Sequence, residues 1–479
     1  MIRRPPRSTP SNSSAASDVY KRQTMPSKSN KNPQSVMFTI FLLFASFMAM
    51  SCKECPTEPE DAPISISVEY TEASIIWLKV TIPDSGRVKS FKVKRDTTIV
   101  EEASFTGNDT IIADKSVEPH KTYTYEAQYI RNEKVLNTSD PINLTTLDTT
   151  SSEFSWEVFY FGDPNFSNYF MDVSIIDENN IWVVGEFKVM EIDSAGNSVR
   201  CYYNAAHWDG NKWELIDIDL KQTVFGVFTI EGNDIWAASG IPHRYDGIKW
   251  EKYNLWNMGI LNSNDGILKK IWGTSSSNTY FVGYNGTIVH YNGSSFTKME
   301  SGTSIDLVDI DGNEERVFVT GYNIIGDLYG ESLALEYSEK RWNTIFTSNK
   351  VNGDLENGDF GRFKSVKVLD DVAVFTTAAA SMVKYYYKNY LIDFTTREET
   401  ILDDRDAVVK IEGNGINDIV FITVGGEVVH FNGKNYQLCY DYEAQNPYSI
   451  MIYGGDCKGD VVCAVGDIPG QGVVIIGRR

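Results

Sequence analysis

The chain has 479 residues and a formal net charge of −21, from 44 Lys and Arg against 65 Asp and Glu. No strong basic run occurs after residue 51, which argues against nucleic-acid binding, because that binding depends on Lys and Arg neutralising phosphates. Six cysteines in this length exclude a disulfide scaffold, whereas 13% aromatic residues and 36 glycines favour an all-β chain.

The first 51 residues are expected to lie outside the folded domains. Residues 1–24 resemble translated sequencing-adapter sequence, so Met25 is the expected start of the natural chain. Residues 25–51 begin with basic residues and continue into an apolar run at residues 37–50, which is too short to span a bilayer comfortably. This pattern predicts a secretory signal peptide.

The signal ends at Ala49-Met50-Ser51-Cys52, which resembles the lipobox of bacterial lipoproteins. That resemblance implies cleavage before Cys52 and lipidation of this residue; an ordinary cleaved signal with a cysteine nearby is the alternative. The Lys and acidic residues after Cys52 resemble the surface-export signal of lipoproteins from the Bacteroidetes group. Residues 52–61 are rich in Pro, Glu and Asp and are predicted to be a disordered tether.

Residues 62–147 are predicted to form a small β-sandwich. Short segments with alternating polar and apolar residues come first, as in half-buried strands. Val117, Pro119 and Tyr123 follow with the spacing of an apolar residue, a proline and a tyrosine. This spacing resembles the tyrosine corner of fibronectin type III domains. The resemblance implies a spacer or an interaction module.

Residues 152–479 contain a repeated motif of the form His-x-(Asp/Asn)-Gly-x-x-aromatic. Its four copies begin at His207, His243, His290 and His430, with one extra residue in the copy at His243. Asp-Gly and Asn-Gly tolerate the positive φ angles that a two-residue hairpin turn requires. Each copy is therefore expected to be a strand, a tight turn and a strand. Strand units that repeat every 40–50 residues or so predict a β-propeller.

A second repeated segment precedes the hairpins, an apolar strand such as Asn-Ile-Trp-Val-Val-Gly at residues 180–185. Seven such segments favour seven blades, with six or eight as alternatives. The last unit stops before its fourth strand, whereas residues 154–160 form a similar strand with no unit before it. This strand is expected to complete the last blade, because ring closure removes exposed sheet edges.

The repeat argues against a catalytic histidine. Four of the five histidines occupy one motif position, which favours packing or hydrogen bonding within each blade. The hairpins resemble kelch blades and the Asp-box turns of sialidase-type propellers, but the Ser-x-Asp-x-Gly-x-Thr-Trp form and the Phe-Arg-x-Pro context of sialidases are absent. We therefore expect no catalytic residue, no metal site and no cofactor.

Long connections carry the binding prediction. In a propeller, the second-to-third-strand and blade-to-blade connections emerge on one face. All the long segments are predicted to be of these two kinds: 161–170, 186–204, 253–266, 322–332 and 346–362. Their aromatic residues suit stacking on sugar rings or anchoring a protein, although they would also cap loops by folding back. The candidate ligand-binding residues are Tyr202, Tyr203, Trp256, Tyr322 and Tyr329.

The sequence thus predicts an outer-membrane, cell-surface lipoprotein whose only membrane attachment is its lipid anchor. Its fold is predicted to be all-β, a fibronectin III-like sandwich followed by a propeller. The propeller is predicted to bind a glycan or an extracellular protein without performing chemistry. The alternative is an extracellular glycan-cleaving hydrolase or lyase on the same scaffold, which would need paired carboxylates in an aromatic-lined funnel.

Overall fold

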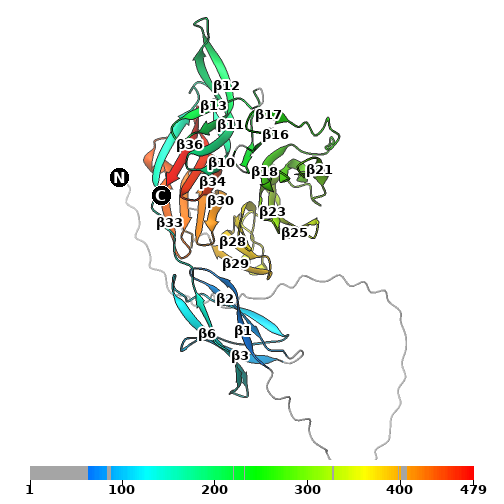
Figure 1. Cartoon of the computed structure of the whole chain (residues 1–479), viewed down its shortest axis with the longest axis vertical. Helices are drawn as coiled ribbons and strands as arrows, with labels where there is room; N and C mark the ends of the chain where they lie inside the picture. Colours follow the sequence, from blue (N-terminus) through cyan, green and yellow to red (C-terminus); the bar gives the residue numbers. More distant parts are fainter. Residues whose placement is uncertain are drawn as a thin grey trace, which may run out of the picture. The chain divides into compact units, whose positions relative to one another are not determined.

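The computed structural model describes residues 63–83, 88–218, 221–230, 232, 234–325, 328–396, 399–400 and 407–479. The adapter-like segment, the predicted signal peptide, Cys52 and the predicted tether at 52–61 lie outside these residues. In the part of the chain that the structure describes, no helix is long and apolar enough to cross a membrane. Strands dominate this part (Figure 1). Its short helices are η1 (Tyr284–Gly286), η2 (Leu355–Asn357) and α1 (Tyr442–Gln445).

The first eight strands form two sheets. One has the order β1 (Ser65–Thr71), β2 (Ile76–Thr81), β5 (Asp109–Asp114). The other has the order β4 (Thr98–Phe105), β3 (Lys89–Arg95), β6 (Thr122–Arg131), β7 (Lys134–Thr138), and β8 (Ile142–Thr145) also pairs with β6. Their inner faces share an apolar core that includes Leu78, Phe91 and Tyr125. The Tyr123 hydroxyl accepts a hydrogen bond from the Glu118 N–H at 2.8 Å, as a tyrosine corner would. The fibronectin III resemblance itself stays a prediction.

The remaining strands form seven four-stranded antiparallel sheets, each a blade. Blade 1 contains β10 (Tyr169–Asp177), β11 (Asn180–Ile192), β12 (Ser198–Trp208) and β13 (Trp213–Ile216). Blade 2 contains β14 (Gly226–Thr229), β15 (Ile235–Ala238), β16 (Pro242–Tyr245) and β17 (Trp250–Lys252). Blade 3 contains β18 (Leu268–Ser275), β19 (Asn278–Gly283), β20 (Ile288–Tyr291) and β21 (Phe296–Met299). Blade 4 contains β22 (Leu307–Gly312), β23 (Val317–Ile325), β24 (Leu328–Ser338) and β25 (Arg341–Ser348).

The last three blades follow the same order. Blade 5 contains β26 (Phe363–Leu369), β27 (Val372–Thr377), β28 (Ala380–Tyr386) and β29 (Leu391–Thr396). Blade 6 contains β30 (Val408–Gly415), β31 (Asp418–Thr423), β32 (Glu427–Phe431) and β33 (Tyr436–Asp441). Blade 7 contains β34 (Met451–Lys458), β35 (Val461–Ile468), β36 (Gln471–Arg478) and β9 (Ser155–Phe161). The strand before blade 1 thus completes blade 7, and the predicted fold class with its seven blades and ring closure is confirmed.

The second strand of several blades contains a glycine where the preceding chain segment approaches too closely for a side chain. A Cβ atom on Gly185, Gly283 or Gly466 would lie 2.1, 1.9 or 2.0 Å from a backbone oxygen at or just before the start of the neighbouring strand. Each glycine stands beside a bulge in that strand. Close packing therefore explains why the repeated Ile-Trp-Val-Val-Gly segment ends in glycine.

The first strands of neighbouring blades contact one another around the ring axis. One edge of each such strand has no neighbour in its own sheet, so its N–H groups need other acceptors. Carboxylates of neighbouring blades provide some of them: Asp172 accepts from the Val227 N–H, Asp309 from the Val366 N–H and Asp456 from the Ile175 N–H. These bonds tie blade 1 to blade 2, blade 4 to blade 5 and blade 7 to blade 1.

Three lysines lie among these carboxylates. Lys270, Lys367 and Lys410 form ion pairs at 2.7, 2.7 and 2.8 Å with Asp172, Glu412 and Asp309, respectively. We call these three lysines, together with Asp172, Asp309, Asp311, Glu412 and Asp456, the axial network. The sequence analysis missed it, although its residues alternate with apolar residues along otherwise apolar strands, as in Lys410-Ile-Glu412.

Asp456 gives the axial network a measurable pH dependence. Burial and repulsion from Glu412 raise the pKa of Asp456 from 3.8 to about 6. The protonated Asp456 carboxyl therefore stabilises the fold fully below about pH 4, and this stabilisation is lost as the pH rises through 6. Asp456→Asn should keep the Ile175 hydrogen bond and remove this loss. We expect urea unfolding to show that the substitution raises the free energy of unfolding at pH 7, relative to that at pH 4, by about 1–3 kcal/mol. An unchanged difference would contradict this role.

Candidate functional site

The strand order assigns each connection to one face of the propeller. Because each blade is a sequential antiparallel sheet, its second-to-third-strand connection and the connection to the next blade lie at the same end. We call this end the loop face and the opposite end the turn face. All five long segments named above make connections of the loop-face kind. Residues 186–204 and 322–332, however, are largely strands of extended hairpins, not loops, because β-prone aromatic and branched residues continue the ladders.

The hairpin of β11 and β12 extends beyond blade 1 and projects from the ring (Figure 1). β10 pairs with β11 only up to Glu186, and β13 pairs with β12 only from Ala205 onwards. The outer strand edges of residues 189–203 therefore lie beyond the blade. Asp193 closes the hairpin by accepting hydrogen bonds from the backbone N–H groups of Ala195 and Asn197 at 2.9 and 2.8 Å.

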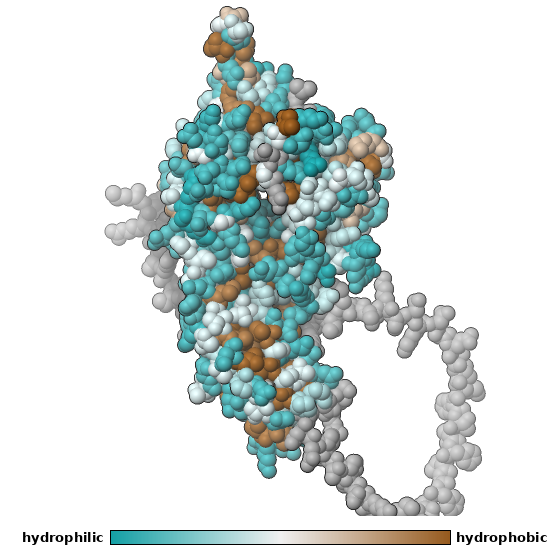
Figure 2. Space-filling view, in the orientation of Figure 1, coloured by the Kyte–Doolittle hydropathy of each residue, from teal (hydrophilic) through white to brown (hydrophobic). Residues whose placement is uncertain are grey.

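The tip of this hairpin is apolar and exposed. Ile192 is 71% exposed and Met190 is 44% exposed. Figure 2 shows hydrophobic colour on the projecting hairpin, over a surface that is mostly hydrophilic around it. Isolated two-stranded hairpins are marginally stable in water. Exposed apolar side chains at such a tip are typical of a site that is buried by a partner.

Three cations surround Tyr202 at the base of the hairpin. The charged atoms of Lys188, Arg200 and Lys221 lie 5.9, 5.1 and 5.1 Å from the centre of the Tyr202 ring. Arg200 also lies 5.1 Å from the centre of the Phe166 ring, so its guanidinium contacts two rings. We call these five residues the Tyr202 cluster. Cation–π attraction holds the charged groups over the rings.

Glu186 neutralises one of these cations. Its carboxylate accepts hydrogen bonds from Lys188 at 2.6 Å, Thr223 at 2.8 Å and the Tyr169 hydroxyl at 3.1 Å. Burial raises the pKa of Glu186, but the hydrogen bonds from Lys188 and Thr223 outweigh it and hold the pKa below its ordinary value. The carboxylate is therefore ionised at neutral pH and pairs with Lys188.

Arg200 and Lys221 keep a surplus of positive charge. Both side chains are exposed, and among the described residues neither has a carboxylate partner. Sequence analysis found Tyr202 but missed its cations. The available signal was the period of two: Lys188 pairs with Tyr202 and Met190 with Arg200, which places all four side chains on one face of the hairpin.

Tyr203 and Trp256 fold back onto their own segments. The Tyr203 hydroxyl donates to Glu191 at 2.6 Å, and its ring lies 5.9 Å from that of Phe187. The bond to Glu191, with burial, raises the pKa of Tyr203 to about 12. Trp256 is half-buried and packs against the core that contains Leu255 and Leu261. These two placements match the alternative in which the aromatic residues cap their loops.

The other two candidates lie in blade 4. Tyr322 belongs to β23, and the Arg362 guanidinium lies 5.1 Å from the centre of its ring. Tyr329 belongs to β24 and stands opposite Ile324 in the ladder. The five candidates thus lie in blade 1, in the connection between blades 2 and 3, and in blade 4. Only Tyr202 and Tyr203 are neighbours in the chain, and a ligand-binding role stays a prediction for each of the five.

The repeated histidines hold the start of the second strand in three blades. The Nε2 atoms of His207, His290 and His430 lie 2.8–2.9 Å from side-chain oxygens of Asn180, Asn278 and Asp418, respectively. In blade 2 the histidine also bonds within its own blade, but it does not occupy the shared position. Because of the extra residue, Arg244 occupies this position and pairs with Asp234 at 2.8 Å, whereas His243 lies 2.8 Å from Ser239 Oγ.

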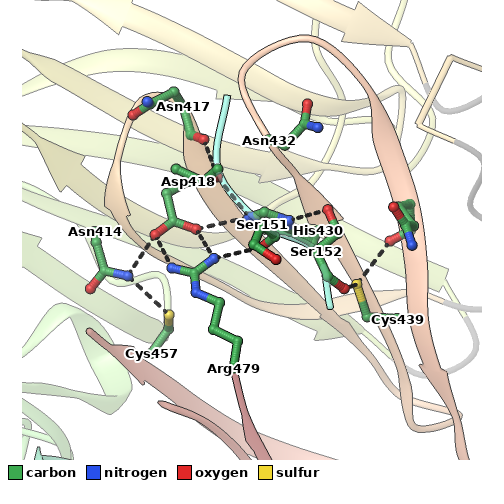
Figure 3. Close-up of polar contacts among 12 residues, drawn as sticks. Ser151, Ser152, Asn414, Asn417, Asp418, His430, Asn432, Cys439, Cys457 and Arg479 are labelled. Carbon is green, nitrogen blue, oxygen red and sulfur yellow. Dashed lines mark hydrogen bonds and ion pairs between the residues drawn. The ribbon is translucent and has the colours of Figure 1, made fainter. Parts of the chain in front are cut away.

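His430 belongs to a wider polar cluster (Figure 3). Its Nδ1 lies 2.7 Å from Ser152 Oγ and its Nε2 lies 2.8 Å from Asp418 Oδ1. Because an ionised carboxylate only accepts hydrogen bonds, Nε2–H donates to Asp418 and Nδ1 accepts from Ser152. Burial raises the pKa of Asp418, but hydrogen bonds from His430 and Arg479 outweigh it and hold the pKa well below its usual range.

This order of groups is that of a Ser-His-Asp triad, but its surroundings are those of a structural hydrogen-bond network. The His430 side chain is fully buried, and the Arg479 guanidinium binds both oxygens of Asp418. The segment before β9 is held at several points: Thr150 donates to the Asn417 carbonyl oxygen and Arg479 to the Ser151 carbonyl oxygen. The cluster fixes residues 150–152 against blade 6.

Two shallow cavities mark other surfaces. One, of about 340 Å³, lies at the loop-face end of blade 3 and is lined by Asp265, Asn285 and Lys298. The other, of about 480 Å³, lies between the sandwich and blades 5 and 6 and is lined by Lys115, Phe394 and Tyr436 among others. Within the described residues, no group of three or more His, Cys, Asp or Glu side chains is arranged to hold a metal ion.

Comparisons with known proteins give distant likenesses. No family model and no curated protein matches the chain. Among solved structures, it is similar to YCF48 bound to D1 peptide, with a TM-score of 0.47 and 12% identity over 68% of this chain and 97% of that chain. It is similar to YCF48 from Cyanidioschyzon merolae, with a TM-score of 0.44 and 12% identity over 68% of this chain and 98% of that one. For BamB from Moraxella catarrhalis the TM-score is 0.35, with 10% identity over 68% and 100%. The sheet order of the chain itself establishes the propeller.

Proposed function

We propose that this chain is a lipid-anchored cell-surface protein that binds a protein partner through the loop face of its propeller and performs no chemistry. The anchor and the location rest on the lipobox-like sequence that ends at Cys52. The observation that carries the binding proposal is the projecting hairpin of blade 1, with its exposed apolar tip and its strand edges outside the blade.

A protein fits this hairpin better than a sugar does. Open strand edges accept an added strand from another chain through main-chain hydrogen bonds, which a glycan does not supply. Exposed Ile192 and Met190 suit burial in a protein pocket. The aromatic rings of Tyr203 and Trp256, by contrast, are engaged by their own segments.

A glycan is the second candidate, because other tyrosines on the loop face are exposed. Tyr160 is 44%, Tyr448 57% and Tyr453 40% exposed. They lie at the end of β9, in the connection after α1 and near the start of β34. Exposed rings of this kind stack on sugars. Binding to immobilised glycans that is lost when Tyr448 and Tyr453 are replaced by Ala would favour this candidate.

Shortening the hairpin tests the main proposal. Val189 pairs with Cys201, so replacing residues 190–200 with Asn-Gly should join the two strands by a two-residue turn. When the variant is purified from the cells that produce it, we expect the partner protein no longer to co-purify. We expect its melting temperature to stay close to that of the native chain. Ile248→Asp is the matched control, because Ile248 is an exposed apolar residue in a turn-face hairpin. Equal co-purification by the shortened chain would contradict the proposal.

Cys52→Ala should release the chain from the membrane fraction.

A further inference from the structure

The Tyr202 cluster departs from the electrostatics of the rest of the chain. The formal net charge is −21, so most of the surface repels anions. Among the described residues, the only carboxylate that pairs with one of the three cations is Glu186, and it pairs with Lys188. Arg200 and Lys221 therefore form a local positive site to which an acidic partner would be steered.

The cluster is also preorganised. The Arg200 guanidinium lies 5.1 Å from both the Phe166 and the Tyr202 ring centres, which restricts its rotation before any ligand arrives. A planar guanidinium held in this way presents paired donors to a carboxylate. The ordering cost of binding is lower for a group that is already restrained.

The placement of the cluster on a strand specifies the shape of its ligand. Arg200 and Tyr202 stand two residues apart on β12 and thus face the same side. Within the described part of the chain, the outer edge of β12 pairs with β13 only from Ala205 onwards. An extended peptide that adds to this edge would present alternate side chains at the same spacing as these two residues.

We propose that the Tyr202 cluster binds an acidic, extended polypeptide segment whose carboxylates occupy alternate positions. This inference rests on the proposed binding function and names the chemistry of its partner. Arg200 and Lys221 neutralise the carboxylates, and the Tyr202 ring keeps both cations in place. The binding is charge-driven, so it weakens as salt increases.

A peptide probe tests this directly with the full chain. A fluorescent peptide of alternating Asp and Val is expected to bind at low salt, whereas its Asn-Val counterpart is not. Arg200→Ala and Lys221→Ala are each expected to weaken binding about tenfold or more, from the loss of charged hydrogen bonds. Tyr202→Phe should retain binding and Tyr202→Ala should reduce it. Lys212→Ala, an exposed cation in a turn-face hairpin, should change nothing.

Two results would overturn the proposal. One is equal affinity of Arg200→Ala and the native chain for the acidic peptide. The other is binding of a polyuronate fragment, but not of the peptide, through Arg200, which would assign the cluster to an anionic glycan. If Arg200→Ala keeps the native partner while hairpin shortening loses it, the binding function stands and the acidic-segment inference falls.

Discussion

Replacing Lys410 with Met is expected to lower the free energy of unfolding of the propeller by about 3–5 kcal/mol. The Lys410 Nζ lies 2.8 and 2.9 Å from the two oxygens of Asp309 and 3.2 Å from Glu412 Oε1. Burial lowers the pKa of Lys410, but the charges of Asp309 and Glu412 outweigh it and keep the pKa above its ordinary value. The variant would leave two buried carboxylates without this counter-charge, which costs much more than the pair itself contributes.

Urea unfolding at neutral pH measures this effect. Lys212→Met is the matched control, because it changes the same residue type at an exposed position, and we expect little change in its midpoint. A Lys410→Met chain as stable as the Lys212→Met chain would show that the axial network does not hold the ring together.

Glu72→Gln is expected to weaken the contact between the sandwich and the propeller by about 3–5 kcal/mol. Glu72 accepts from Lys384 and from the Tyr386 hydroxyl, and the Glu72 and Lys384 side chains are 1% and 3% exposed. Lys384 stands where other blades carry His or Arg, so the sandwich provides the anion for this cation of blade 5. The amide of Gln would leave Lys384 buried without its counter-charge.

Calorimetry and limited proteolysis measure the consequence. We expect the single thermal transition of the native chain to separate into two, with faster cleavage near residues 148–152. Glu118→Gln is the control: the Glu118–Lys434 pair also joins the sandwich to the propeller, but both side chains are exposed, and no measurable change is expected. One unchanged transition in Glu72→Gln would mean that apolar contacts, such as that of Trp77 with the Tyr386 ring, suffice.

The repeat made the ring predictable from the sequence. The Asp-Gly and Asn-Gly turns located the hairpins in the sequence. The strand at residues 154–160, which has no unit before it, indicated closure with the last unit. Local chemistry determines both features, so a local pattern reveals them. The same patterns misjudged residues 186–204, because aromatic residues in a long connection suggest a loop as readily as a strand.

Long-range polar contacts were not predictable in this way. Glu72 and Lys384 are 312 residues apart, and no spacing rule connects a sandwich strand to a particular blade. For the Tyr202 cluster the sequence supplied one member of five. Lys188 and Arg200 could have been added from strand alternation, but Phe166 and Lys221 come from separate blade-to-blade connections, and only the fold brings them to the ring of Tyr202.

Photo-crosslinking in producing cells tests the binding face most directly. A photoreactive amino acid would replace Met190 at the hairpin tip or Ile248 in a turn-face hairpin; both are exposed apolar residues. We expect a discrete protein adduct from position 190 and none from position 248. An adduct from position 248 alone, or equal adducts from both positions, would contradict this expectation.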